Sequence, residues 1–166
     1  MLVTGGSSGI GEVIAVTLAG SGAVVGIHYN TGGGKARQMA ERFANGSTAL
    51  GADLFDPEAA KNLFVEAVEA LGGIDLLVNN AGIFIPAHPA SGHGEWMKTW
   101  ENTIAVNLTS AGILCREAIE HFSGRGGRIV NIASRAAFRG ETADYLAYAA
   151  SKGGMISLSR SIARSF

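Results

Sequence analysis

The chain has 166 residues, 47% of them hydrophobic and 16% charged, and its formal net charge is −1 at pH 7. A chain of this length fits one domain with a sizeable core, and its hydrophobic content argues against intrinsic disorder. The balanced charge gives no electrostatic reason to expect a nucleic acid or an anionic membrane as a partner.

A single cysteine, Cys115, precludes a disulfide within the chain and is typical of a reducing compartment. It lies in an apolar helical run, which favours a buried, inert thiol over a nucleophile. No apolar run reaches the roughly 20 residues needed to span a bilayer. We therefore expect a soluble, cytoplasmic protein.

Apolar runs and helical patterns alternate along the chain. The N-terminal part predicts a strand at 1–4, a glycine-rich turn at 5–11, a helix ending at 20–22, a strand at 23–29, a helix at 35–44 and a strand at 48–52. The remainder predicts a helix at 57–71, a strand at 74–78, a loop at 84–95, a helix at 96–122 with a break at 101–103, a strand at 128–133 and a helix at 148–166. This alternation indicates an α/β fold, a doubly wound parallel sheet of Rossmann type in a single domain.

Two local patterns predict where one helix starts and which face of another is buried. Asp56-Pro57-Glu58 combines a capping Asp, a Pro at the first helical position and an acidic first turn, which marks a helix start. In the first helix, helical spacing places four apolar residues on the inner face, Val13, Ile14, Val16 and Leu18. We expect ligands beyond the carboxyl ends of the strands, where the strand order reverses.

The glycine-rich turn joins the first strand to the first helix. Glycines there let the backbone approach a pyrophosphate, whose charge is favoured at a helix N-terminus. The spacing, Gly5-x-x-x-Gly9-x-Gly11, differs from the common G-x-G-x-x-G fingerprint, and glycine also serves ordinary tight turns. The position after a strand, in the first βαβ unit, favours a nucleotide.

Polar residues recur where strands end and inside one apolar helix. The run Asn79-Asn80-Ala81-Gly82 directly follows the fourth strand, where it forms either a ligand-binding turn or an ordinary strand-ending turn. Asn107 interrupts an apolar helix, and a buried amide needs hydrogen-bond partners, whether in a site or only in the core.

Three further residues follow the fifth strand. Tyr148 and Lys152 are four residues apart, a spacing that places them on one face of a helix, and Ser134 precedes them across a loop. A hydroxyl, a phenol and an ammonium group could converge there, although such a Tyr–Lys pair also occurs by chance on surface helices.

Taken together, these motifs resemble the short-chain dehydrogenase/reductase family, and its 3-oxoacyl reductase-like branch in particular. The resemblance covers nearly the whole chain and is carried, in the family's order, by TGGSSGIG at 4–11, Asp53, NNAG at 79–82, Asn107, Ser134 and Tyr148-x-x-x-Lys152. Tyr148 matches rather than Tyr145, because only Tyr148 has a lysine four residues on.

The resemblance implies that Tyr148 is the general acid/base that exchanges a proton with the substrate oxygen. A free phenol has a pKa near ~10, so the nearby positive charges of Lys152 and of the oxidised nicotinamide ring are needed to favour its charged form. Lys152 would also bond the nicotinamide ribose, Ser134 would orient the carbonyl, and Asn107 would anchor a water that links Lys152 to solvent.

The same resemblance implies a nicotinamide dinucleotide as cofactor. Besides Tyr148 and Lys152, its expected contacts lie in the turns after the strands: Gly5, Ser7, Ser8, Gly9, Ile10, Gly11, Tyr29, Asn30, Asp53, Leu54, Asn80, Ala81 and Gly82. Asp53 would bond the adenine amino group.

The choice between NADP and NAD depends on the end of the second strand. No carboxylate follows it to accept the ribose hydroxyls and repel a 2′-phosphate, and Lys35 and Arg37 lie just beyond. Against this, Ser8 occupies a position that is often basic in NADP-preferring members. We expect NADP to be favoured over NAD.

Other polar clusters give weaker signals. His88, His93 and Glu95 lack the spacing of a metal site, so no metal is expected. The arginines at 125, 128, 135 and 139 either attract an anionic substrate or form a solvated rim. Trp96 and Trp100 are interpreted as helix packing or a pocket wall.

Family members normally continue through two further strands and a substrate-covering loop, whereas this chain ends at Phe166. We therefore expect a dinucleotide-binding domain that lacks those parts, with the fifth strand as an exposed edge. The expected function is NAD(P)-dependent interconversion of a carbonyl compound, of the 3-oxoacyl thioester or small carbonyl type, and a secondary alcohol. The alternative is a truncated, catalytically silent nucleotide-binding module or a fragment. By resemblance, the 96–122 and 148–166 helices would form a homodimer or homotetramer.

Overall fold

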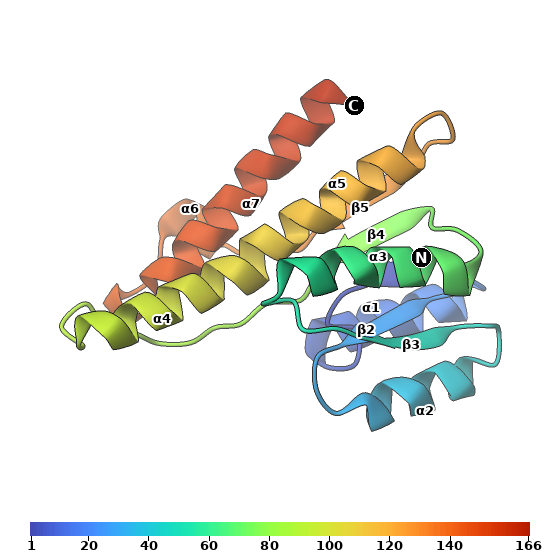
Figure 1. Ribbon diagram of the computed structural model, residues 1–166, viewed down its shortest axis with the longest axis horizontal. Coiled ribbons are helices and arrows are strands. Elements are labelled where there is room, and N and C mark those ends of the chain that lie inside the picture. The colour runs from blue at the N-terminus through green and yellow to red at the C-terminus, as the bar shows by residue number, and fades with distance from the viewer.

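Five short strands form one parallel sheet in the computed structural model, which describes residues 1–166 (Figure 1). The strands are β1 Leu2–Val3, β2 Gly26–Tyr29, β3 Thr48–Gly51, β4 Leu76–Asn79 and β5 Arg128–Asn131. Their order in the sheet is β3-β2-β1-β4-β5, with β1 at the centre. The doubly wound sheet predicted from the alternation of strands and helices is confirmed.

Helices connect successive strands, and two more follow the last strand. They are α1 Gly9–Gly20, α2 Gly33–Phe43, α3 Pro57–Leu71, α4 His93–Ile104, α5 Ser110–Phe122, α6 Ala136–Arg139 and α7 Leu146–Ser165. The predicted start of α3 is confirmed, because the Asp56 carboxylate accepts a hydrogen bond from the Glu58 backbone N–H at 2.9 Å. None of the helices combines the length and apolar character that a membrane crossing requires.

The sheet separates two apolar clusters. Successive strand residues point to opposite faces, so Leu2 and Val3 of β1, both fully buried, belong to different clusters. One cluster packs β1, β3 and β4 against α3 and α5, and the other packs β1, β2 and β4 against α1 and α2. The central strand is therefore covered on both faces, as its continuous apolar sequence requires.

The predicted inner face of α1 is only half right. Ile14 and Leu18 pack against the core, but Val13 is 65% exposed and Val16 is 49% exposed. The buried positions are Gly11 and Ala15. The helix approaches the glycine turn so closely that a Cβ on Gly11 would lie 2.2 Å from the Gly5 carbonyl oxygen, so small residues form the contact.

The long helix predicted over 96–122 is not broken at 101–103. It begins at His93, inside the predicted loop, and α4 continues through a π-helical segment, Ala105–Thr109, into α5 (Figure 1). The extra residue per turn thus falls around Asn107, and π segments of this kind are frequent at functional sites. The last helix also begins earlier than predicted, at Leu146, and follows a 3-10 turn, Ala143–Tyr145.

The fifth strand forms one edge of the sheet. It pairs only with β4, and its Arg128 and Val130 side chains are exposed, which confirms the predicted edge. A groove of about 720 Å³ lies between α5, β5 and α7, with Phe122, Ile129 and Ile162 among its lining residues. The sheet is therefore covered at β1 and open at β5.

Candidate active site

The strand order reverses between β1 and β4, and the turns after these two strands are bonded together. The Thr4 hydroxyl oxygen accepts hydrogen bonds from the backbone N–H groups of Asn80 and Ala81, each at 3.0 Å. The Asn80 amide Nδ2 donates to the carbonyl oxygens of Thr4 at 2.9 Å and Gly5 at 3.3 Å. Asn80 thus positions the glycine turn against the 79–82 turn.

A cavity of about 370 Å³ opens beside these turns. Nine of the residues predicted to contact a cofactor line it: Gly5, Ser7, Ser8, Tyr29, Asn30, Asp53, Leu54, Ala81 and Gly82. Four lining residues were missed by the sequence: His28, Thr31, Ile83 and Val106. Each of the four is next to a predicted site residue in the sequence, and this adjacency could have identified them.

Six predicted cofactor contacts lie outside that lining: Gly9, Ile10, Gly11, Asn80, Tyr148 and Lys152. Gly9, Ile10 and Gly11 form the first turn of α1, and the Ile10 side chain is 66% exposed. Asn80 lies beneath the glycine turn that it bonds, and Tyr148 and Lys152 belong to α7.

The glycine turn has the chemistry of an anion site. Its Ser8 caps α1 in an extended conformation without a side-chain hydrogen bond, which leaves the first N–H groups of the helix to a ligand. Gly5 has a φ of +60°, and a Cβ on it would lie 3.1 Å from the Ala81 Cα. Glu12, in the first turn of α1, is paired with Lys35 at 2.6 Å. The residues present therefore fit a dinucleotide pyrophosphate.

Asn107 is fully buried in the π-helical segment and joins three parts of the site. Its Oδ1 accepts from the Ile83 backbone N–H at 2.7 Å, and its Nδ2 donates to the Ile83 carbonyl at 2.9 Å and the Ser151 hydroxyl at 3.2 Å. The Ser151 hydroxyl in turn donates to the Tyr148 carbonyl at 2.8 Å. Both amide protons of Asn107 are used, so its side chain fixes α7 relative to the segment after β4.

Lys152 is the buried charge of the site, with 3% of its surface exposed. Its Nζ donates to the Ile132 carbonyl at 2.8 Å and lies 5.8 Å from the centroid of the Tyr148 ring. Burial lowers the pKa of the Lys152 ammonium from its ordinary value. The predicted Tyr–Lys pair therefore lies on one face of α7, one helical turn apart, with Lys152 buried and Tyr148 half-buried.

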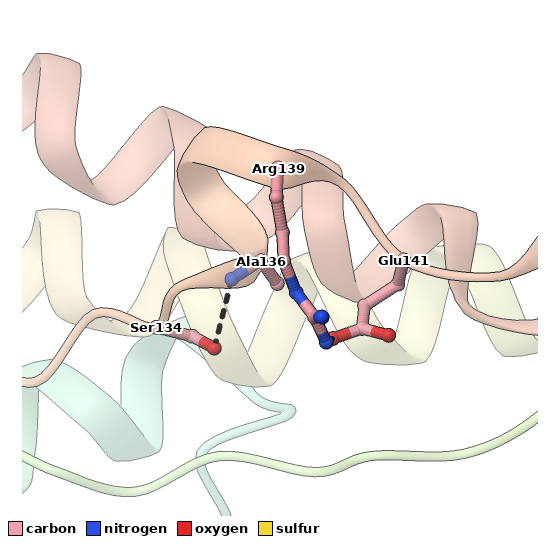
Figure 2. A network of polar contacts seen from close by, with 4 residues as sticks. All are labelled: Ser134, Ala136, Arg139 and Glu141. Carbon is pink, nitrogen blue, oxygen red and sulfur yellow. Dashed lines mark hydrogen bonds and ion pairs between the residues drawn. The ribbon is translucent and has the colours of Figure 1, made fainter.

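Ser134 lies between β5 and α6, and Figure 2 shows its surroundings. Its hydroxyl oxygen accepts a hydrogen bond from the Ala136 backbone N–H at 3.2 Å, which orients the side chain at the start of α6. Arg139 at the end of α6 pairs with Glu141 at 3.2 Å, so this arginine is already engaged (Figure 2). Ser134 is two residues from Ile132, the acceptor of the Lys152 bond.

An aromatic cluster that the sequence did not indicate surrounds Tyr148. The Phe84 ring lies parallel to the Tyr145 ring with centroids 3.8 Å apart, and the Tyr148 ring meets Phe84 edge-on at 4.7 Å. The Ala87 N–H donates to the Asp144 carbonyl at 2.8 Å and attaches the 84–95 loop to the turn before α7. Tyr145 and Tyr148 thus take different places around Phe84.

The sequence and the structure were compared with known proteins. The model of the short chain dehydrogenase family matches residues 1–166. A 2-dehydro-3-deoxy-D-gluconate 5-dehydrogenase of Bacillus subtilis is 38% identical over 98% of this chain and 63% of its own length. A 3-oxoacyl-[acyl-carrier-protein] reductase of Aquifex aeolicus is 35% identical over 98% of this chain and 66% of its own length.

The structural comparison agrees with the sequence comparison. A Sinorhizobium meliloti 1021 protein assigned as a short-chain alcohol dehydrogenase superposes with a TM-score of 0.88 at 34% identity, covering 98% of this chain and 64% of that one. An uncharacterized oxidoreductase of Thermotoga maritima is 38% identical over 98% of this chain and 63% of its own length. The chain spans less than two thirds of the length of these relatives.

Proposed function

The chain belongs to the short-chain dehydrogenase family, and we propose that it interconverts a ketone and a secondary alcohol with a nicotinamide dinucleotide, with Tyr148 as general acid/base. The observation that carries this proposal is the burial of Lys152 one turn from Tyr148, within 5.8 Å of its ring and bonded to Ile132. An isolated buried ammonium is unfavourable, so its retention beside a phenol favours a chemical role over chance spacing.

The nicotinamide ring, when bound, supplies or accepts the hydride. In the reducing direction Tyr148 gives its phenolic proton to the substrate oxygen, and Lys152 stabilises the phenolate that remains. The Ser134 hydroxyl, oriented by the Ala136 N–H, donates to the same oxygen. Asn107 keeps α7 in register with the Ile83 segment and would anchor a water that links Lys152 to solvent.

We propose NADP as the preferred cofactor. The cavity wall at the end of β2 is formed by Tyr29 and Asn30 without a carboxylate. Arg37 donates to the Tyr29 hydroxyl at 3.3 Å, which places a guanidinium beside that wall, while Lys35 is engaged by Glu12. A guanidinium at this place would attract a 2′-phosphate, and the end of β2 has no carboxylate that would repel one.

We propose a small carbonyl compound or a 3-oxoacyl thioester as substrate. Two relatives support this class: the names of the Bacillus subtilis and Aquifex aeolicus proteins assign them a keto-acid sugar derivative and a 3-oxoacyl group. Both names describe chemistry at a secondary alcohol or its ketone. The exposed Phe84 beside Tyr148 offers an apolar surface to the part of the substrate next to the reacting carbon.

We propose that the protein acts in the cytoplasm as a homodimer or homotetramer built on the α4–α5 helix and α7. Its single cysteine is free and buried, which suits a reducing compartment. Small residues on α7, such as the exposed Ala150, permit close helix contact. Sedimentation at micromolar concentration should give a species of at least twice the chain mass, and a monomer would contradict the assembly.

The test of the function is hydride transfer by this chain to a panel of carbonyl compounds with NADPH and NADH. Replacing Tyr148 with Phe should lower turnover by a factor of about 10² to 10⁴ and leave dinucleotide binding unchanged, because only the acid/base group is removed. Tyr145→Phe is the matched control, since it keeps the ring stacked on Phe84 and should retain turnover.

Three outcomes separate the readings. Equal turnover in Tyr148→Phe and the wild type would refute the catalytic assignment. Dinucleotide binding without turnover in any of these proteins would favour a silent binding module. Failure to bind either dinucleotide would refute the oxidoreductase proposal as a whole.

A further inference from the structure

His28 is the buried histidine among the four in the chain, with 2% of its surface exposed. It is the third residue of β2, and both of its ring nitrogens contact the backbone of neighbouring turns. Nδ1 accepts from the Gly5 N–H at 3.0 Å, and Nε2 lies 3.0 Å from the Ala52 carbonyl oxygen. The His28 carbonyl also accepts from the Gly6 N–H at 2.9 Å. One residue thus holds two consecutive peptide groups of the glycine turn.

These partners determine the state of the ring. The Gly5 N–H can only donate and the Ala52 carbonyl can only accept, so the bonded ring is neutral and carries its proton on Nε2. A protonated imidazole would direct a second N–H at the N–H of Gly5. Both contacts therefore exist together only while His28 is uncharged.

We propose that neutral His28 is a positioning residue of the dinucleotide site, which fixes the glycine turn against the turn after β3 through Gly5 and Ala52. The inference rests on the proposed function, since it concerns the cavity assigned there to the cofactor. Both turns line that cavity, the glycine turn through Gly5, Ser7 and Ser8 and the turn after β3 through Asp53 and Leu54. His28 itself lines the cavity between them.

The charges around His28 determine when it titrates. Burial lowers the pKa of the imidazole from its ordinary value, and the Asp53 carboxylate in the turn after β3 opposes this only in part. Among the other elements packed on β2, α2 has Lys35 and Arg37 engaged by Glu12 and Tyr29, α3 keeps its charged side chains exposed, and β1 has none. Dinucleotide affinity should therefore fall in acid, as pH drops through the lowered pKa of His28.

Two amide variants each retain one of the two hydrogen bonds of the His28 ring. In His28→Asn, Oδ1 can replace Nδ1 as acceptor for Gly5, but no donor reaches Ala52. In His28→Gln, Nε2 can replace the ring Nε2 as donor to Ala52, but it does not accept from Gly5 in the same geometry. His28→Leu removes both polar contacts at similar volume. The wild type and the three variants, each with all 166 residues, are titrated with NADPH by calorimetry from pH 5 to pH 8.

At pH 8, each lost contact should weaken NADPH binding by about threefold to tenfold, the equivalent of one hydrogen bond, with the largest loss in His28→Leu. The acid decline should be steeper in the wild type than in both amide variants, because an amide does not titrate and the variants keep only the part that comes from protonation of the NADPH 2′-phosphate. A wild-type acid decline that persists unchanged in His28→Asn would overturn the proposal, as would equal affinities in all four proteins.

Nitrogen-15 NMR of the wild type provides a second readout that does not need the cofactor or the variants. The His28 ring should be the neutral Nε2–H tautomer at pH 7. The Gly5 amide signal should shift over the same pH range in which the His28 ring becomes protonated. An Nδ1–H tautomer or an already charged ring at pH 7 would refute the positioning role. If the wild type bound no dinucleotide at any pH, the proposed function would fail, whereas the NMR result would still test the contact.

Discussion

The two sides of the sheet hold their functional residues in different ways. Around the glycine turn, on β1 and β2, short side chains bond neighbouring backbone groups, as Thr4, Asn80 and His28 do, and both strands lie inside the sheet. Around β5 and α7, long side chains reach across loops, as Lys152 does to Ile132, and β5 lies at an open edge. After the roles proposed above, we call the first the cofactor side, where the contacts join the turns after neighbouring strands, and the second the catalytic side, where the Lys152 contact joins α7 to the segment after the edge strand β5.

The largest effect is expected on the catalytic side, from removing its buried charge. Lys152→Met keeps the length of the side chain but deletes the ammonium that bonds Ile132 and faces Tyr148, so turnover should fall by a factor of about 10² or more. Steady-state kinetics measures this. Arg160→Met, an exposed cation on the same helix, is the control and should keep wild-type turnover.

Comparing the wild type with Lys152→Met also tests whether Lys152 is buried, through the pH dependence of the free energy of unfolding. Burial lowers the pKa of the folded lysine below its unfolded value of 10.5, so the unfolded chain binds more protons between those two values. The free energy of unfolding of the wild type, relative to Lys152→Met, should therefore rise as pH increases through the lowered pKa toward 10.5. Denaturant unfolding across that range measures the difference, and parallel curves would contradict a buried ammonium.

On the cofactor side, Gly11 leaves the least room for a side chain. A Cβ there would lie 2.2 Å from the Gly5 carbonyl oxygen and 2.4 Å from the Asn80 Nδ2. Gly11→Ala should lower the free energy of unfolding by about 1–3 kcal/mol and weaken dinucleotide binding, because the helix must move off the turn. Thermal and denaturant unfolding measure the first effect.

Gly20→Ala is the matched control for Gly11→Ala on the same helix. Gly20 is the last residue of α1, and a Cβ on it would meet no atom within 4 Å. The added methyl should leave stability unchanged or raise it by up to about 1 kcal/mol, since it restricts only the unfolded chain. Equal destabilisation by the two substitutions would show that close packing at the turn is not the cause.

The kind of hydrogen-bond partner explains what the sequence could predict on both sides. The glycines, Asn80 and the Asp56 cap were readable from residue type and from their positions at the end of a strand or the start of a helix. The partners of Asn107, Lys152 and His28 are largely backbone groups of Ile83, Ile132, Gly5 and Ala52, which carry no signature in residue type. The sequence therefore named the polar residues of the site without the atoms that they bind.

The misassigned faces and boundaries have a related cause. Val13 and Val16 fit helical periodicity, but α1 lies so close to its turn that Gly11 and Ala15 form the contact instead. The π-helical segment around Asn107 adds a residue to the turn without any helix-breaking sequence. The predicted break at 101–103 therefore lies a few residues before this irregularity, and the helix itself is continuous. Both depend on how close two elements lie in space, and periodicity along one element does not report that distance.

A smaller effect is expected from the proposed phosphate contact at the end of β2. Arg37→Ala should weaken NADPH binding by about tenfold, the equivalent of one charge-assisted contact, and leave NADH binding unchanged. Arg42→Ala, an exposed arginine in the last turn of the same helix, is the control and should change neither. Equal losses for NADPH and NADH would assign Arg37 to the support of Tyr29 and remove the basis for preferring NADP.

The smallest effect on stability, and the most direct test of the open edge, is expected at Val130. This residue is 42% exposed on β5, whose second edge has no strand partner, whereas Val65 is 44% exposed on the surface of α3. A lysine at either position should change the free energy of unfolding by no more than about 0.5 kcal/mol. Only Val130→Lys should reduce higher-order association in sedimentation velocity, because a charge on an unpaired edge opposes the addition of another strand. If Val65→Lys reduces association equally, net charge rather than the β5 edge controls it, and the two sides of the sheet do not differ in this respect.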